Sequence, residues 1–274
     1  MNKAKIKKGA FIASLAALVL VGSTAAFLTS TDIADNWFTV GKVDLDITET
    51  FEEGKTLAAG EIITKQPSVK NEGTVNQLFF AEVCVPVMKT TLVGTDGQRI
   101  IPNGVTMPAS ADDYRQPAEI YNLLANTNTS PLSVTHTPAD SKFGTISYNN
   151  ASDTVKGWYF IKQGTSFTVD TEHKLQGFND GTYNTYLFGY NAWVAPNNST
   201  IPIFDELQLR SMVDGDIEGG TIGQVTIRAC TIQADSLEIS GLSGNGSTKL
   251  YTKTDLEKIY KVCENKENAA QEGN

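Results

Sequence analysis

The sequence predicts an all-β protein folded as an antiparallel β-sandwich, and three observations support this prediction. Segments of alternating apolar and polar residues recur along the chain, as they do in strands with one buried face. The most regular segment, residues 78–88, has an unbroken apolar face formed by Phe79, Ala81, Val83, Val85 and Val87. Turn residues separate these segments, and a clear helical pattern occurs near the C-terminus.

The first residues of the chain have the pattern of an export signal. A cluster of four lysines precedes an apolar run at residues 10–21 and a short stretch of small residues. We expect a signal peptidase to cut between Ala25 and Ala26, which makes residues 1–25 a signal peptide and the mature protein secreted. A retained membrane anchor is disfavoured because the apolar run is shorter than the roughly 20 residues that cross a bilayer as a helix.

The segment after the cleavage point leads into the first predicted strand. Val43, Leu45 and Ile47 alternate with polar residues, which predicts a half-buried strand. The residues before this strand include large apolar side chains, namely Phe27, Ile33, Trp37, Phe38 and Val40. Two interpretations stay open. They form an ordinary strand on their own sheet, which the residues alone slightly favour, or a free strand that adds to the open edge of another subunit.

Composition excludes several classes of partner. The chain is 40% hydrophobic and 19% charged, which permits a sizeable core and argues against wholesale disorder. Removing residues 1–25 lowers the basic count from 22 to 18 against 31 acidic residues, and the formal net charge from −9 to −13. This charge repels nucleic acids and anionic membrane surfaces, so we expect no nucleic-acid partner.

The three cysteines fit neither a zinc site nor a disulfide-rich scaffold. Cys84 and Cys230 each lie on the less apolar face of a predicted strand. If these strands are neighbours in an oxidising compartment, the two residues can pair as a disulfide. Independent thiols are an equally good interpretation. If the pair does form, Cys263 on the C-terminal helix is the cysteine without a partner.

The central part of the chain loses the strand pattern. Residues 102–153 are rich in Asn, Thr, Ser and Pro, and we expect a loop and helix insertion there. Within it, Pro117 opens a predicted short helix over residues 117–125. Strand patterns then resume, so that residues 26–246 are expected to form one sandwich domain.

A C-terminal helix is predicted within residues 247–263. Thr254 and Glu257 have the spacing of a capping box. The apolar residues at helical spacing lie on one face, namely Leu256, Ile259, Tyr260 and Cys263. We expect this face to dock on the body, and residues 264–274 to be disordered because they have almost nothing to bury.

We expect no catalytic residue, no metal site and no cofactor. A zinc protease helix needs two histidines one turn apart, with a glutamate beside the first. This chain has only His136 and His173, and neither is followed by Glu. The acidic turn at residues 214–219 is similar to the start of a calcium loop, but Val225 stands where such a loop needs a bidentate Glu.

Several blocks of the sequence match those of a known family. The first blocks are Ala26-Phe27, Phe38, Gly41 and Val43-Asp44-Leu45, followed by Val69-Lys70-Asn71 and Gly73. The most specific block is the last, Ile232-Gln233-Ala234-Asp235. In these blocks the chain resembles the TasA/camelysin family of Gram-positive secreted proteins, whose signal peptide is processed by a dedicated signal peptidase.

This resemblance implies a jelly-roll sandwich and a role in fibres. TasA-like proteins are biofilm-matrix components, so the resemblance favours a donated N-terminal strand and head-to-tail polymerisation into extracellular matrix or cell-surface fibres. The partners it implies are further copies of the chain, the signal peptidase and a related accessory matrix subunit. Camelysin is described as a metalloprotease. The alternatives are therefore a camelysin-like secreted metalloprotease and a monomeric surface-binding module.

Overall fold

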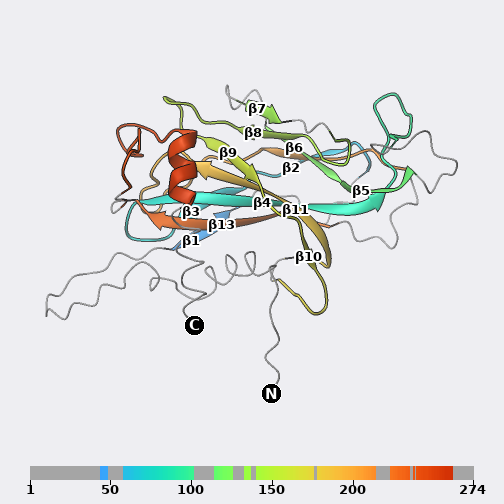
Figure 1. The fold of residues 1–274 in the computed structure, drawn as a ribbon, viewed down its shortest axis with the longest axis horizontal. Helices are drawn as coiled ribbons and strands as arrows, with labels where there is room; N and C mark the ends of the chain where they lie inside the picture. Colours follow the sequence, from blue (N-terminus) through green and yellow to red (C-terminus); the bar gives the residue numbers. More distant parts are fainter. Residues whose placement is uncertain are drawn as a thin grey trace, which may run out of the picture.

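A computed structural model describes residues 44–48, 58–101, 114–125, 133–136, 140–175, 178–213, 223–234, 237 and 239–261 (Figure 1). In this part of the chain the secondary structure is almost entirely β-strand, with one short helix near the C-terminus. The strands form two large sheets and one small sheet of two strands. The predicted all-β fold, an antiparallel sandwich with a C-terminal helix, is therefore confirmed.

One large sheet has six strands. At its centre, β4 (Gln77–Thr90) pairs with β11 (Gly181–Tyr190) on one side and with β13 (Thr226–Gln233) on the other. Two strands pair with successive parts of β11, namely β9 (Trp158–Gln163) and β10 (Phe167–Val169). The C-terminal end of β4 pairs with β5 (Gln116–Glu119). All these pairs are antiparallel.

The other large sheet has five strands in the order β2-β12-β6-β8-β7. They are β2 (Ile62–Thr64), β12 (Glu206–Leu209), β6 (Tyr121–Leu124), β8 (Ile146–Asn149) and β7 (Ser133–His136). The β6–β8 pair is parallel and the other pairs are antiparallel. The edges of this sheet are therefore β2 and β7.

The small sheet pairs β1 (Leu45–Thr48) with β3 (Ser68–Asn71) and lies beside β13. Leu45 and Ile47 are half-buried and pack against the main core, while Asp46 between them is exposed. The predicted alternation is thus confirmed for the residues from Leu45 onwards. It exists because successive side chains of a strand point to opposite faces.

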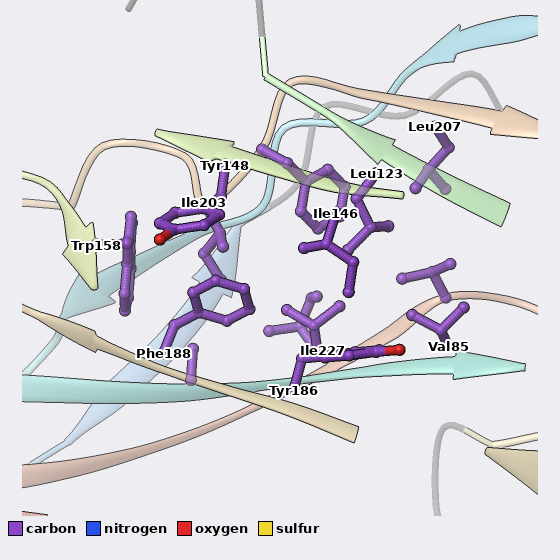
Figure 2. Packing of buried hydrophobic residues seen from close by; sticks show 14 of the residues in the cluster. Val85, Leu123, Ile146, Tyr148, Trp158, Tyr186, Phe188, Ile203, Leu207 and Ile227 are labelled. Carbon is purple, nitrogen blue, oxygen red and sulfur yellow. The ribbon is translucent and has the colours of Figure 1, made fainter. Parts of the chain in front are cut away.

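The main core lies between the two large sheets (Figure 2). Phe188 of β11 and Ile227 of β13 point toward Ile146 and Tyr148 of β8. The rings of Tyr148 and Phe188 meet edge to face, with their centroids 5.1 Å apart. Such contacts explain the apolar face of β4 predicted from the sequence, because that face lines this core.

A second core covers the outer face of the six-stranded sheet. Leu78 and Phe80 of β4 pack there against the C-terminal helix, residues 253–261. Leu256 and Ile259 of this helix are fully buried, which confirms the predicted docking face. The first half of β4 is therefore apolar on both of its faces, as expected for a strand that is covered on both sides.

The capping box of this helix differs from the predicted one. The structure uses Thr252 and Asp255 in place of Thr254 and Glu257. The Asp255 amide donates to Thr252 Oγ1 at 3.2 Å, and the Thr252 amide donates to Asp255 Oδ2 at 3.0 Å. Asp255 also accepts from the backbone amide of Ser243 at 2.7 Å. Both pairs have the three-residue spacing of a capping box, and this tertiary contact favours the earlier one.

The prediction for residues 117–125 is wrong. They contribute to strands β5 and β6, with Pro117 on β5 and Leu123 buried on β6. A proline is tolerated on a short strand that pairs only with the end of β4, since the missing N–H need not join a ladder. Because β6 and β8 lie inside the five-stranded sheet, the segment 102–153 supplies part of the sandwich and is not an insertion into it.

Candidate functional site

The N-terminal segment joins the sandwich at its side, through β1. The Glu72 amide donates to Asp44 O at 3.1 Å, and the hydroxyls of Thr48 and Ser68 hydrogen-bond at 2.8 Å. These contacts attach the segment to the small sheet and not to the middle of a large one. The predicted cleavage point and donor strand lie outside the described residues, namely Ala25, Ala26, Phe27, Ile33, Trp37, Phe38 and Val40.

Asn71 fixes the end of this attachment. Its side chain is fully buried, and its Nδ2 donates to Val75 O at 2.8 Å and to Val194 O at 2.7 Å. Its Oδ1 accepts the amide of Gly73 at 2.9 Å. One amide side chain therefore holds the turn from β3 to β4 against the segment that follows β11. This geometry explains why an asparagine is required here, because only an amide offers both donors and an acceptor.

The edge strands of the two large sheets meet on the side of the sandwich opposite β1 (Figure 1). β7 ends the five-stranded sheet, and β9 lies beyond β11 in the six-stranded sheet. The His136 ring of β7 stacks on the Phe160 ring of β9, with centroids 5.4 Å apart and 27° between the planes. We use the name β7–β9 mouth for the patch of side chains at this edge, which consists of Val134, His136, Tyr148 and Phe160.

The apolar surface of the β7–β9 mouth is incompletely covered. Val134 lies opposite Tyr148 in the β7–β8 ladder, so it points toward the main core, yet it is 40% exposed. Phe160 is half-buried, although its ring centroid lies 5.7 Å from that of core residue Phe188. The mouth therefore offers apolar contacts beside a strand edge, which is the combination used in strand addition.

The two histidines are far apart in the fold. His136 lies in the β7–β9 mouth, whereas His173 is exposed in the loop after β10, with Nδ1 3.0 Å from Asp170 Oδ1. The hydrogen bond from the His173 amide is the main cause that lowers the pKa of Asp170. Among the described residues, no group of three or more His, Cys, Asp or Glu side chains is placed to hold a metal ion. The acidic turn at residues 214–219 lies outside them.

A buried carboxylate, which no local sequence pattern indicates, connects two strands of the six-stranded sheet, β5 and β11, with the loop before β8. Glu119 of β5 is fully buried and accepts hydrogen bonds from Asn184 Nδ2 at 2.7 Å, from the Gly144 amide at 2.6 Å and from the Tyr186 hydroxyl. Burial raises the pKa of Glu119, and these hydrogen bonds oppose the rise. The nearby Arg210 donates from Nη1 to Glu119 O at 2.9 Å.

We assign this cluster a structural role because the Glu119 carboxylate has no exposed surface through which a substrate could reach it. The signal in the sequence is weak. Glu119 is a single acid among apolar residues, and its side-chain partners lie 25 to 67 positions further along the chain. A sequence pattern of a few residues cannot contain these contacts.

Cys84 and Cys230 lie on neighbouring strands, as the disulfide interpretation required, but they do not form a disulfide. The register places Cys84 opposite Thr226 and Cys230 opposite Phe80, which offsets the two thiols by four residues. That offset is about 13 Å along a strand, whereas a disulfide needs Cα atoms within about 7 Å. The disulfide alternative is therefore wrong. Burial raises the pKa of Cys84 to about 12, so its thiol is unreactive.

Comparison with known proteins gives one family match. The family model described as camelysin metallo-endopeptidase matches residues 2–177, which is more than half of the chain. No curated protein and no solved structure matches the chain. In the part of the chain that the structure describes, no helix is long and apolar enough to span a membrane.

Proposed function

The chain belongs to the camelysin metallo-endopeptidase family, whose members are extracellular or associated with the cell surface, and we propose that it is a structural protein of extracellular fibres. In this proposal the signal peptide is removed between Ala25 and Ala26. The segment thus freed is donated as a strand to the next copy, and repetition of this step builds a matrix or surface fibre.

The observation that carries the proposal is the position of β1. The segment of residues 26–43 precedes a strand that is anchored to β3 at the side of the sandwich, beside β13. A donor segment attached at the side of the sandwich can bind a neighbouring molecule without unfolding the core of its own subunit. Donation then adds backbone hydrogen bonds along the donor and buries its alternate side chains in the acceptor.

The assembly is expected to be an open chain of identical subunits. Each copy gives one strand and receives one, so the two surfaces in contact are different, and such head-to-tail contacts form filaments when the rotation does not close. The partners are copies of the same chain. A related accessory matrix subunit with a compatible strand would add to the same end.

Two purified forms test this function, one starting at Ala26 and one starting at Thr39. Both contain every described residue, so circular dichroism and thermal melting should show the same fold. Negative-stain microscopy and sedimentation should show filaments for the first form and single particles for the second. Filaments from the form that starts at Thr39 would refute strand donation, and so would single particles from both forms across concentration and pH.

The family description favours a second candidate, a secreted metallo-endopeptidase. The described residues do not fit the zinc site of such an enzyme, because the only two histidines of the chain, His136 and His173, lie in different parts of the fold. The test is hydrolysis of a denatured protein substrate with and without 1,10-phenanthroline. Chelator-sensitive hydrolysis that disappears in His136→Ala or His173→Ala would favour the enzyme over the fibre.

A further inference from the structure

We propose that the β7–β9 mouth is the acceptor for the donated strand, which adds to the edge of β7 and extends the five-stranded sheet. The occupant is the N-terminal segment of a second copy, residues 33–40. This inference rests on the proposed function, and it names the surface that receives the strand.

The two edges of the five-stranded sheet differ in how far they close the core. At β2, the inward-facing residue Ile63 is 4% exposed, so the core is covered there. At β7, the inward-facing residue Val134 is 40% exposed. A strand that is added beside β7 covers inward-facing apolar surface that is open to water. At β2 the inward face is already covered, and the exposed Ile62 lies on the face turned away from the core. Burial of the open inward-facing surface favours β7.

The strand β7 also lacks the usual features that prevent strand addition. Its sequence, Ser133–His136, contains no proline and no lysine or acidic residue. Edge strands that avoid association carry such residues, because a proline removes a backbone donor and a buried charge is costly. In contrast, the start of β9 is already engaged: Trp158 O accepts the Ala151 amide at 3.0 Å and forms a bridge with Asn150.

The proposed donor has side chains that suit this acceptor. In an extended strand, Phe38 and Val40 point to the same face. When that face is turned inward, the two side chains lie against Val134 and the Phe160 ring. The exposed His136 ring stacks on Phe160, so the donor competes with this ring for the same apolar surface.

The positions of donor and acceptor account for an open filament. The donor segment directly precedes β1 in the sequence. β1 lies beside β13, and the mouth lies at the opposite side of the sandwich between β7 and β9 (Figure 1). Each contact between copies therefore joins two different surfaces, the β1 side of one copy and the mouth of the next. Head-to-tail addition repeats the same contact along one direction.

Full-length processed chains with complementary defects test the acceptor. Val134→Lys places a charge in the mouth and leaves the donor intact, whereas the double variant Phe38→Asp, Val40→Asp spoils the donor and leaves the mouth intact. Ile62→Lys is the matched control, because Ile62 is an apolar residue, 47% exposed, on the other edge strand of the same sheet. Thermal melting verifies that each variant keeps the wild-type fold.

We expect Val134→Lys to raise the concentration needed for filaments at least about tenfold, as is typical when a central contact of an interface is lost. Ile62→Lys should polymerise like the wild type. A mixture of Val134→Lys with the donor variant should form a 1:1 dimer by sedimentation, because one strand of the first chain still finds one intact mouth in the second.

The outcomes separate this inference from the proposed function. Wild-type filaments together with undisturbed filaments of Val134→Lys would overturn the acceptor and leave strand donation standing. Loss of filaments in Ile62→Lys with retention in Val134→Lys would place the acceptor at β2. A wild-type chain that stays monomeric at every concentration would overturn both proposals.

Discussion

Replacement of Asn71 by alanine should lower the free energy of unfolding more than replacement of an exposed polar residue does. The Asn71 side chain makes three hydrogen bonds from a fully buried position. Alanine leaves the Gly73 amide and the Val75 carbonyl without these partners. The Val194 carbonyl keeps one donor, since the Gln77 amide also bonds to it at 3.0 Å. At about 1–3 kcal/mol for each buried group left unsatisfied, we expect a loss of about 3 kcal/mol.

Asn71→Asp gives a second, more specific expectation. The aspartate can still accept the Gly73 amide, but its other oxygen faces the carbonyls of Val75 and Val194, which are acceptors as well. At pH 7 this variant should therefore be at least as unstable as Asn71→Ala. Its deficit should shrink in acid, because a protonated carboxyl can donate to one of the two carbonyls.

Urea unfolding of the processed chain, followed by tryptophan fluorescence, measures these differences. Asn150→Ala is the matched control, since Asn150 is half-buried and donates one hydrogen bond, to the carbonyl of the next residue. It should cost about 1 kcal/mol or less. If Asn71→Ala proves as stable as Asn150→Ala at an unchanged m-value, the conclusion that the buried Asn71 hydrogen bonds stabilise the turn between β3 and β4 is refuted.

Three further predictions concern other parts of the fold. The raised pKa of Glu119 means that the folded state holds a proton more tightly than the unfolded state, so its contribution to stability is fully present below the ordinary carboxyl pKa and is lost as the pH rises through the raised value. In urea unfolding, the free energy of unfolding of the wild type should exceed that of Glu119→Gln by more at pH 5 than at pH 8. A larger difference at pH 8 would contradict the raised pKa of Glu119. Thermal unfolding should show that Thr252→Ala lowers the stability by about 1 kcal/mol and that Thr254→Ala hardly changes it. Equal effects would contradict Thr252 as the capping residue. Thiol labelling with mass spectrometry should modify Cys84 only after denaturation, and a Cys84–Cys230 linked peptide from non-reduced protein would refute the register.

The elements that the sequence predicts well are those with strong local signals. The strand at residues 78–88 is β4, because an alternating apolar face over so many residues fits a strand and little else. The helix face of Leu256, Ile259 and Tyr260 is buried as its spacing requires. In both cases the information lies within one element, and the core that covers the element follows from the pattern.

Prediction from the sequence fails where contacts between distant residues determine the secondary structure, the strand register or a side-chain cluster. The apolar run at 117–125 is too short for its period to distinguish a helix from two strands, and pairing with β4 and β12 selects strands. Cys84 and Cys230 have the expected neighbouring strands, but the register depends on the whole length of β4 and β13. The Glu119 cluster and the β7–β9 mouth combine residues from separate strands, which no local pattern brings together.

The central claim is that the N-terminal strand of one copy lies in the mouth of the next, and photo-cross-linking tests it most directly. A photoreactive phenylalanine analogue at position 38 is irradiated in filaments assembled from equal amounts of ¹⁴N- and ¹⁵N-labelled chains, and the cross-linked peptides are mapped by mass spectrometry. The account predicts mixed-isotope cross-links between position 38 and Ser133–His136 or the neighbouring Phe160. Cross-links within single chains, or to β2, would contradict it.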